Sequence, residues 1–234
     1  MESRVRRRPG KWSFWQHHWL AHHKLIRALE RVRDEIQGEL LDVGCGSRPF
    51  APVLVTRVRH YWGVDLPGSS AVDPNEAPDA WARAEMLPVR SGSIDVVLGL
   101  AMLSYLQVPD LMLIEARRVL RPGGIVVIEF LAMGPPWNAP YDYWRFTRYG
   151  AEVLLRRNGF QPTRFVPVGG LMGRIGLSAT DALERLNHGP LRLLMWIPVR
   201  LLNTVLQVVF ELLDQVFADP DEPISHLIVA RRVE

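Results

Sequence analysis

The chain has 234 residues, of which 48% are hydrophobic and 23% are charged, and its formal net charge is +3. This composition agrees with one soluble domain plus additions, and the charge is too small to point to nucleic acid as the main partner. The single cysteine, Cys45, excludes an intrachain disulfide and is consistent with a reducing cytoplasm.

The first eleven residues, MESRVRRRPGK, contain five arginines or lysines and one glutamate. They lack the apolar stretch of a signal peptide, so export by that route is not expected. Two interpretations stay open: a solvated tail, or a basic segment attracted to an anionic membrane surface or to nucleic acid. No platform of interleaved aromatic and basic residues follows it, so we expect no nucleic-acid partner.

Residues 13–36 form a predicted amphipathic helix, because aromatic and aliphatic residues recur there at helical spacing. His18 and His22 lie one turn apart in the same stretch. No neighbouring cysteine or acid completes a ligand set for a metal ion, so we expect no metal site.

The segment LLDVGCGS at residues 40–47 is the most informative stretch of the chain. An apolar run followed by an acid and Gly-x-Gly is typical of a strand that ends where the backbone approaches a ligand. Gly44 and Gly46 carry no Cβ, so they can adopt positive φ and leave room for that ligand. Asp65 lies 19 residues beyond Gly46, where an acid in nucleotide-binding sheets typically binds ribose hydroxyls. The pattern predicts a ligand with an adenosine-like half.

The same spacing disfavours a dinucleotide. The fingerprint Gly-x-Gly-x-x-Gly would need its third glycine at Pro49. Proline removes one of the N–H groups that a pyrophosphate needs at the start of a helix, and Arg48 adds bulk there. Asp42, just before the glycines, can instead accept from an amine or organise the turn. These residues favour S-adenosylmethionine, which has an amino-acid half, over NAD.

At this point the chain resembles the class I S-adenosylmethionine-dependent methyltransferases, whose first motif reads acid-x-Gly-x-Gly. Arg-Pro-Phe at residues 48–50 is typical of one subgroup, similar to methyltransferase type 11, and so is PYDYWRFT further on. The matches cover residues 40–170 and continue in order with AEMLP at 84–88, SIDVVLG at 93–99, EARRVLRPGG at 115–124 and PYDYWRFT at 140–147.

This resemblance implies where the cofactor binds. The leading helix is expected to cover one mouth of the cofactor cleft. The backbone of Cys45 is expected to matter more than its thiol, because the residue stands between two glycines. The implied cofactor contacts are Asp42, Gly44, Cys45, Gly46, Asp65, Leu66, Ala84, Glu85 and Leu100.

The loop at residues 140–147 supplies the candidates for catalysis. Positive sulfur already activates the methyl group, so the protein mainly aligns the acceptor, and an oxygen acceptor also needs a base. Asp142 is the candidate base, and Tyr141 or Tyr143 would position the acceptor. Arg145 would hold an anionic group in bidentate fashion. Alternatively, Asp142 and Arg145 form an ion pair that only fixes the loop.

Three departures from the family pattern leave a non-catalytic relative as an alternative. Arg83 stands where an acid usually faces the adenine amino group, Ser104 replaces the glutamate of a Leu-Glu-His motif, and Tyr141 replaces a frequent histidine. Such a protein would act as a cofactor-binding or membrane-associated partner.

The region between residues 170 and 220 has the most unusual composition. Three alternatives stay open for its segment 191–217: packing on the sheet domain, formation of a homodimer, or contact with a membrane surface. Its longest uncharged run, residues 201–210, is too short to span a bilayer, which needs roughly 20 residues. A wide apolar helix is predicted for residues 198–217, with one narrow polar stripe of Arg200, Asn203, Gln207, Glu211 and Asp214.

We therefore expect an α/β fold with a doubly wound, mostly parallel seven-stranded sheet, which is the Rossmann-like architecture of class I methyltransferases. The resemblance makes the last strand antiparallel. The strands are predicted near residues 39–43, 60–65, 80–84, 94–99, 124–130, 163–168 and 224–231. The expected organisation is a basic tail and helix at 1–37, a cofactor-binding core at 38–170, a helical insertion at 171–220 and a final strand at 221–234.

The expected function is S-adenosylmethionine-dependent methyl transfer. The acceptor is expected to be small, or linked to a lipid or a glycan, since the resembling subgroup often accompanies glycan and cell-envelope pathways. The expected location is the cytoplasm, with a peripheral membrane contact and a homodimer as alternatives for its assembly.

Overall fold

The computed structural model describes residues 15–16, 18–73, 75–185, 192–217 and 219–233. The chain divides into two compact units. The sheet unit contains Leu29–Val166 and residues 226–233. The helical unit contains the described residues of 15–28 together with those of Pro167–Ser225. Helix α1 (Trp19–Val32) and the last two strands pass from one unit into the other.

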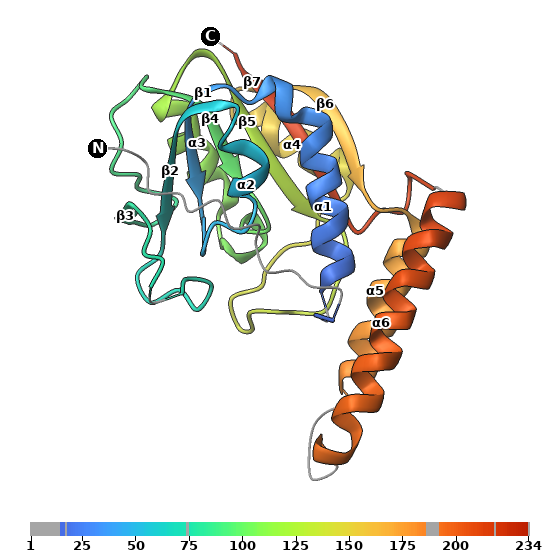
Figure 1. Ribbon diagram of the computed structural model, residues 1–234. Helices are drawn as coiled ribbons and strands as arrows, with labels where there is room; N and C mark the ends of the chain where they lie inside the picture. The colour runs from blue at the N-terminus through green and yellow to red at the C-terminus, as the bar shows by residue number, and fades with distance from the viewer. Residues whose placement is uncertain (1–14, 17, 74, 186–191, 218, 234) are drawn as a thin grey trace. The chain divides into compact units, whose positions relative to one another are not determined.

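The sheet has seven strands in the order β3-β2-β1-β4-β5-β7-β6 (Figure 1). The predicted fold class is confirmed. Strands β1 to β5 pair in parallel. The strands are β1 (Gly38–Val43), β2 (Val58–Asp65), β3 (Ala80–Trp81), β4 (Ile94–Gly99), β5 (Leu120–Leu131), β6 (Phe160–Val168) and β7 (Ser225–Arg232).

Strand β7 runs antiparallel to β6. At one end of the pair, the Ile224 N–H donates to the Val168 carbonyl (3.0 Å). At the other end, the Val233 N–H donates to the Gly159 carbonyl (2.9 Å). The antiparallel last strand is therefore present, as the resemblance implied.

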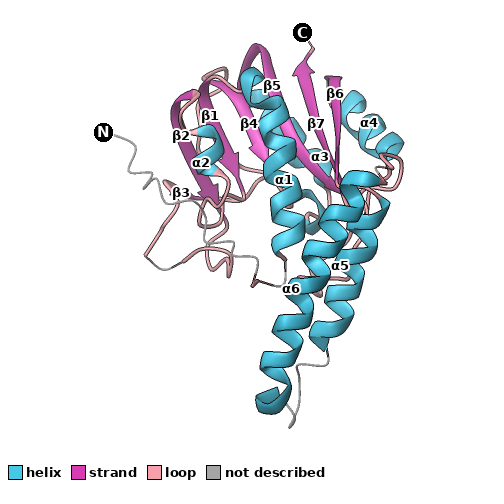
Figure 2. Cartoon of the chain, turned by 45° about the vertical axis from the view of Figure 1, so that its right-hand side comes forward, coloured by secondary structure: helices cyan, strands magenta, loops and turns pink. Residues whose placement is uncertain are grey.

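The central strands are buried on both faces, as is typical of parallel sheets. All residues from Val96 to Gly99 in β4 and from Ile125 to Leu131 in β5 are buried. Within the sheet unit, α2 (Ala51–Leu54) covers one face, and α3 (Pro109–Val119) and α4 (Arg148–Arg157) cover the other (Figure 2). The 3₁₀ segment η2 (Leu103–Tyr105) follows β4.

The junction between α3 and β5 differs from the predicted turn. Helix α3 ends at Val119, and strand β5 begins directly at Leu120, before the proline and glycines that were expected to form the turn. Gly123 does adopt positive φ (+76°), and the register with β4 shifts between Leu120 and Ile125. The turn is therefore an irregularity within a longer strand, because the residues on both sides of it pair with β4.

The helical unit contains an antiparallel pair, α5 (Leu171–Glu184) and α6 (Arg192–Val216) (Figure 1). Helix α6 starts six residues before the predicted position and includes Pro198. Most of its polar stripe is buried. The exposed fractions are 1% for Asn203, 0% for Gln207, 6% for Glu211 and 6% for Asp214.

An ion-pair cluster at the end of α6 explains why this polar side is buried. Lys24 Nζ lies 2.7 Å from both Glu211 Oε2 and Asp214 Oδ2. Asp214 also accepts from the N–H groups of Gly170 (3.1 Å) and Gly173 (2.8 Å) at the start of α5. Gly170 has no side chain that could cap the helix, so a carboxylate from α6 satisfies these N–H groups and faces the positive end of the α5 dipole.

We expect Lys24→Met to lower the free energy of unfolding by about 3–5 kcal/mol, because it removes the buried cation that two buried carboxylates share. The matched control is Arg27→Met. Arg27 pairs with the same Glu211 (3.1 Å) but is 46% exposed, so its loss should cost less than about 1 kcal/mol. Urea unfolding followed by far-UV circular dichroism measures both, and equal losses would contradict the buried cluster as the stabilising element.

Candidate functional site

The Gly44–Gly46 turn follows β1 at the carboxyl edge of the sheet. Gly44 has a φ of +73° and Gly46 a φ of +49°, the left-handed region that favours glycine. A Cβ on Gly44 would lie 3.0 Å from the Met102 side chain, which follows β4. A Cβ on Gly46 would lie 3.0 Å from the Ala71 carbonyl, which follows β2. The turn is therefore enclosed by the segments that follow β2 and β4, the two strands on either side of β1.

The N–H groups of this turn all donate to acceptors of the protein itself. Gly44 and Cys45 donate to the Val64 carbonyl (2.9 and 3.1 Å), and the three following N–H groups are equally occupied. A pyrophosphate needs several free N–H groups at such a turn. The geometry agrees with the argument against a dinucleotide. The acceptors for residues 46–48 are Asp65 Oδ2, the Ala71 carbonyl and the Cys45 carbonyl.

Asp65, at the end of β2, ties the turn to the next strand. Its Oδ2 accepts from the Gly46 N–H (2.7 Å), and its Oδ1 accepts from the Leu66 N–H (2.7 Å). The carboxylate is buried (6% exposed). Each oxygen has a second lone pair, so the group can accept from ribose hydroxyls while it keeps both backbone bonds. Its role in ribose binding stays a prediction.

Asp42 lies in β1, where its Oδ2 accepts a short bond from the Tyr61 hydroxyl (2.5 Å) on β2. Burial raises the pKa of Asp42 to about 7, and the Tyr61 bond opposes that shift. A cationic amine nearby would stabilise the carboxylate and lower this pKa. The residue is therefore suited to a site that receives an ammonium group, and it also organises the two strands.

Arg48 and Gly63 form a part of the site that the sequence did not predict. Arg48 adopts positive φ (+53°), and its Nη2 donates to Asp79 Oδ2 (2.8 Å), which also accepts from the Gly63 N–H (2.7 Å). A Cβ on Gly63 would lie 2.7 Å from Arg48 Nε and 2.8 Å from Cys45 Sγ. Glycine therefore fits this position near the end of β2, because two side chains of the turn occupy the space above it.

Cys45 is a buried filler within this arrangement. Its thiol lies against Gly63, and burial followed by the charge of Asp42 raises the pKa of the thiol to about 12. The thiolate is the reactive form of cysteine, so this thiol is held in its unreactive state.

The structure brings the nine predicted cofactor residues to one edge of the sheet. They follow or end β1, β2, β3 and β4, which are adjacent and parallel, so their carboxyl ends coincide. Leu66 is half exposed, and Leu100 is buried directly after β4. Ala84 is buried in the segment after β3, where Glu85 pairs with Arg83 (3.2 Å).

The catalytic candidates of the 140–147 loop are largely bonded to one another. Asp142 Oδ1 accepts from Arg145 Nη1 (2.5 Å), and its Oδ2 accepts from Arg145 Nη2 (3.1 Å) and from the Trp137 N–H (2.9 Å). These bonds, the Arg145 bond first, lower the pKa of Asp142. Arg145 also donates to the carbonyls of Pro135 (2.7 Å) and Trp144 (2.8 Å). This geometry favours the ion pair that fixes the loop, and roles in catalysis stay predictions.

The same loop is attached to the segment after β4. The Tyr143 N–H donates to the Ser104 carbonyl (2.8 Å), and the Tyr143 hydroxyl accepts from Gln107 (3.0 Å). Tyr141 is 59% exposed and remains accessible to an acceptor molecule. The ends of β4 and β5 therefore form one connected wall beside the cofactor residues.

Three residues of this wall were not predicted as site residues. Ser104 is buried, and its Oγ has no hydrogen-bond partner among the described residues. Burial raises the pKa of Tyr105, and the charges of Asp142 and Glu129 raise it further. Glu129 is itself buried near the end of β5. The Leu-Glu-His position had marked Ser104 only as a departure from the family pattern, and no pattern along the chain indicates Glu129, which reaches this wall only when β4 and β5 pair.

His22 of α1 and His18, which precedes that helix, are not part of a metal site in the described residues, where no group of three potential ligands occurs. Burial, with His18 next, lowers the pKa of His22 to about 3, so its ring is neutral.

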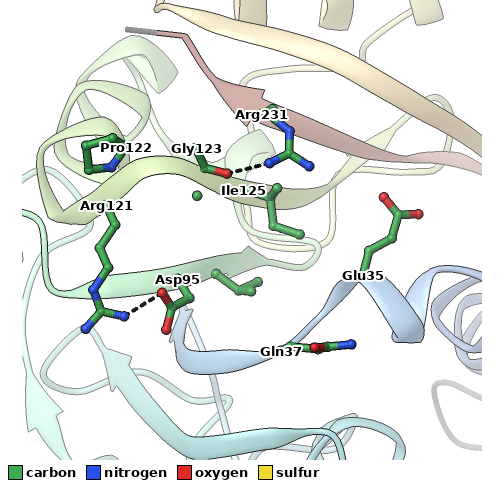
Figure 3. A pocket seen from close by; sticks show the side chains of 10 residues that line it. Glu35, Gln37, Asp95, Arg121, Pro122, Gly123, Ile125 and Arg231 are labelled. Carbon is green, nitrogen blue, oxygen red and sulfur yellow. Dashed lines mark hydrogen bonds and ion pairs between the residues drawn. The ribbon is translucent and has the colours of Figure 1, made fainter.

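A pocket of about 260 Å³ lies at the opposite edge of the sheet (Figure 3). It is lined by residues at the amino ends of β1, β4 and β5, among them Gln37, Asp95 and Gly123. Ligands of open α/β sheets bind outside the carboxyl ends of the strands. Asp95 is paired with Arg121 there (2.5 Å), and we assign this pocket no part in cofactor binding.

Comparison with known proteins indicates a methyltransferase domain in this part of the chain. Residues 41–128 match the family model of a methyltransferase domain. A Mycolicibacterium gilvum protein described as an uncharacterized methyltransferase is 29% identical over 136 residues, which are 53% of this chain and 52% of that protein. The chain thus spans about half the length of this curated relative.

Two solved structures share the fold. A possible histamine N-methyltransferase of Thermotoga maritima gives a TM-score of 0.58 at 16% identity, over 92% of this chain and 91% of that one. Phosphoethanolamine N-methyltransferase 2 of Haemonchus contortus, solved with S-adenosylmethionine, gives 0.58 at 17% identity, over 94% of this chain and 57% of that one. The sheet unit therefore has the class I methyltransferase fold.

We expect Gly44→Val to abolish cofactor binding while the chain stays folded, because valine cannot adopt this φ without strain and its Cβ would meet Met102. The strain itself should cost about 1–3 kcal/mol of stability. Gly92→Val is the matched control, since Gly92 also has positive φ (+62°) but a Cβ there would meet nothing within 4 Å. Calorimetric titration measures both, and normal binding by Gly44→Val would mean that the cleft lies elsewhere.

The buried carboxyl of Asp42 predicts a pH dependence of stability. Its folded pKa of about 7 lies above the ordinary value of 3.8, so between these values the folded chain binds more protons than the unfolded chain. Its contribution to the free energy of unfolding must then fall as pH rises from about 4 to about 7. Asp42→Asn keeps an acceptor for Tyr61 without the titration.

Relative to the unmodified chain, Asp42→Asn should therefore gain up to about 4 kcal/mol of stability over that pH range. Urea unfolding of both chains at several pH values measures the difference. Parallel curves for the two chains would show that Asp42 is not held protonated by burial.

Proposed function

We propose that this chain catalyses methyl transfer from S-adenosylmethionine to a small acceptor, or to one linked to a lipid or a glycan. The observation that carries the proposal is the Gly44–Gly46 turn. It has positive φ at both glycines and is held by Asp65 at the joined carboxyl ends of β1, β2 and β4. The match of residues 41–128 to a methyltransferase domain supports it.

The residues of the turn fit the cofactor in three respects. The glycines leave the main chain open to a ligand that a Cβ would exclude. Asp65 retains lone pairs for the ribose hydroxyls, and Asp42 would receive the ammonium group of the amino-acid half. The occupied N–H groups of residues 44–48 suit a ligand without a pyrophosphate.

The cofactor, when bound, supplies a methyl group that positive sulfur has already activated. The protein then has to hold the acceptor in line with the sulfur–methyl bond and to keep water away. We assign the holding of the acceptor to the wall formed by the segments after β4 and β5, with Tyr141 as its exposed member. Ser104 is a candidate to bind the acceptor, because its buried hydroxyl has no partner among the described residues.

An oxygen acceptor would also need a group that takes its proton. Glu129, rather than Asp142, is our preferred candidate for that role. Asp142 is engaged on both oxygens and its pKa is lowered, so it is a weak base. Glu129 is a carboxylate buried near the end of β5, and its charge acts on Tyr105 in the segment after β4.

We expect S-adenosylmethionine to bind and NAD not to bind in calorimetric titration. Asp65→Ala should weaken binding of S-adenosylmethionine by about 1.5–3 kcal/mol, the value of hydrogen bonds to a charged group. Asp95→Ala is the matched control, because Asp95 also accepts from a backbone N–H, that of Glu39 (2.8 Å), but at the opposite edge of the sheet. Binding of NAD in place of S-adenosylmethionine would overturn the proposal.

A non-catalytic role is the second candidate, and the closed Asp142–Arg145 pair favours it. Such a protein would bind S-adenosylmethionine without converting it to S-adenosylhomocysteine. Incubation with lipid and glycan extracts of the cell envelope, followed by mass measurement of both cofactor forms, distinguishes the two. Turnover that Glu129→Gln abolishes without loss of cofactor binding would support the enzyme.

A further inference from the structure

Helix α6 has its polarity reversed relative to an ordinary surface helix. From Leu201 to Leu212, every exposed side chain is leucine or valine, with exposed fractions of 42–57%. The exposed residues are Leu201, Leu202, Val205, Val208, Val209 and Leu212. An amphipathic helix of a water-soluble protein places such residues inward and its polar residues outward.

The inward side of α6 explains how this reversal is tolerated. Asn203 donates to Glu184 of α5 (3.1 Å), and Gln207 accepts from the Leu20 N–H (3.0 Å). Glu211 and Asp214 share Lys24, and Glu211 also pairs with Arg27. Each of these four polar side chains of α6 therefore has a partner within the helical unit itself.

The two helices of the pair also approach each other very closely. A Cβ on Gly176 would lie 2.5 Å from the Phe210 Cβ, and a Cβ on Gly173 would lie 3.1 Å from Asp214. Small residues at a helix contact, together with hydrogen bonds between the helices, are the means by which helices associate within lipid. Val199 of α6 and Leu177 of α5 are buried, while the leucines and valines on the opposite side of α6 stay exposed.

The apolar stretch of α6 is long and mostly unburied. Met195–Val216 is 22 residues long, and by length and composition it could cross a membrane, while only 22% of it is buried. A core helix of a soluble protein passes the same test of composition but is mostly buried.

We propose that the outward face of α6 docks on a lipid bilayer, with the helix lying in the surface of one leaflet. It does not cross the membrane, because Lys24 and its two carboxylates must stay on the inward side. A protein partner is the weaker explanation, since protein interfaces have a polar rim and the exposed residues between Leu201 and Leu212 include no polar side chain.

Two features of the sequence complement such a surface. Trp196, 51% exposed, lies at the start of the apolar stretch, where aromatic side chains commonly mark the interface of a membrane. The basic residues of the first eleven positions would add attraction to anionic headgroups. The docking does not rest on the proposed methyl transfer, because none of these residues belongs to the cofactor turn.

Flotation of the full chain with vesicles tests the proposal. We expect the chain to float with vesicles of phosphatidylcholine and phosphatidylglycerol, and more weakly with phosphatidylcholine alone. The double substitution Val205→Glu and Leu212→Glu should lower the partition coefficient at least about tenfold, because two apolar anchors become charged. Its melting temperature and its titration with S-adenosylmethionine should stay unchanged, which separates this test from that of the proposed function.

The matched control substitutes two apolar helix residues of the sheet unit, Ile114→Glu and Val153→Glu. They are 53% and 60% exposed, similar to Val205 and Leu212, and should leave vesicle binding unchanged. Trp196 provides a local readout. Brominated lipids should quench the tryptophan fluorescence of the unmodified chain more than that of Trp196→Phe.

Four outcomes would overturn the proposal. The first is failure of the unmodified chain to float with either kind of vesicle, and the second is an equal loss of binding in the control pair. The third is binding to anionic vesicles that the Val205 and Leu212 substitutions leave intact, because basic residues alone would then explain it. The fourth is a dimer in light scattering that these substitutions dissociate in the absence of vesicle binding, which would assign the face to a second copy.

Discussion

Both units of this protein depend on one requirement: backbone N–H groups that are buried at glycine-containing turns need a hydrogen-bond acceptor. Glycine permits the required backbone path, but it brings no side chain to satisfy the N–H groups exposed there. A carboxylate from a distant position supplies the acceptor in each unit. Asp65 serves the Gly46 turn after β1, and Asp214 serves Gly170 and Gly173 at the start of α5. These two carboxylates hold the elements that carry the proposed functions.

In the sheet unit, this requirement restricts the kind of ligand that the turn could bind. The N–H groups of the turn are all hydrogen-bonded within the protein, so a ligand at the proposed site would meet the main chain and the carboxylates of Asp42 and Asp65 without free N–H groups. That arrangement suits a nucleoside joined to an amino acid better than one joined to a pyrophosphate. The loop after β5 forms the other wall, and its ion pair gives it a fixed position beside Ser104 and Tyr105.

In the helical unit, the same requirement reverses the polarity of a helix. Asp214 faces inward because it accepts from the N–H groups at the start of α5. Lys24 pairs with it, and with Glu211, which lies on the same side of α6 one turn earlier. The leucines and valines on the opposite side are then left outward. A face of this kind is unusual for a protein surrounded by water, and it is stable where hydrocarbon replaces water.

The sequence by itself determined the fold class and the glycine turn: the apolar runs, Gly44, Gly46 and Asp65 were readable because they depend on local backbone geometry and regular spacing. All seven strands were predicted, with ends that differ by a few residues: β5 is longer than predicted, and β3 ends at Trp81 where residue 84 was predicted. The direction in which α6 turns its polar stripe was decided only by tertiary structure, because periodicity defines two faces but cannot say which one is buried. The Arg48–Gly63 contact likewise required the folded chain, because no spacing rule gives the distance between a turn and a neighbouring strand. The Asp142–Arg145 ion pair was one of two alternatives drawn from the sequence, and the structure contains it.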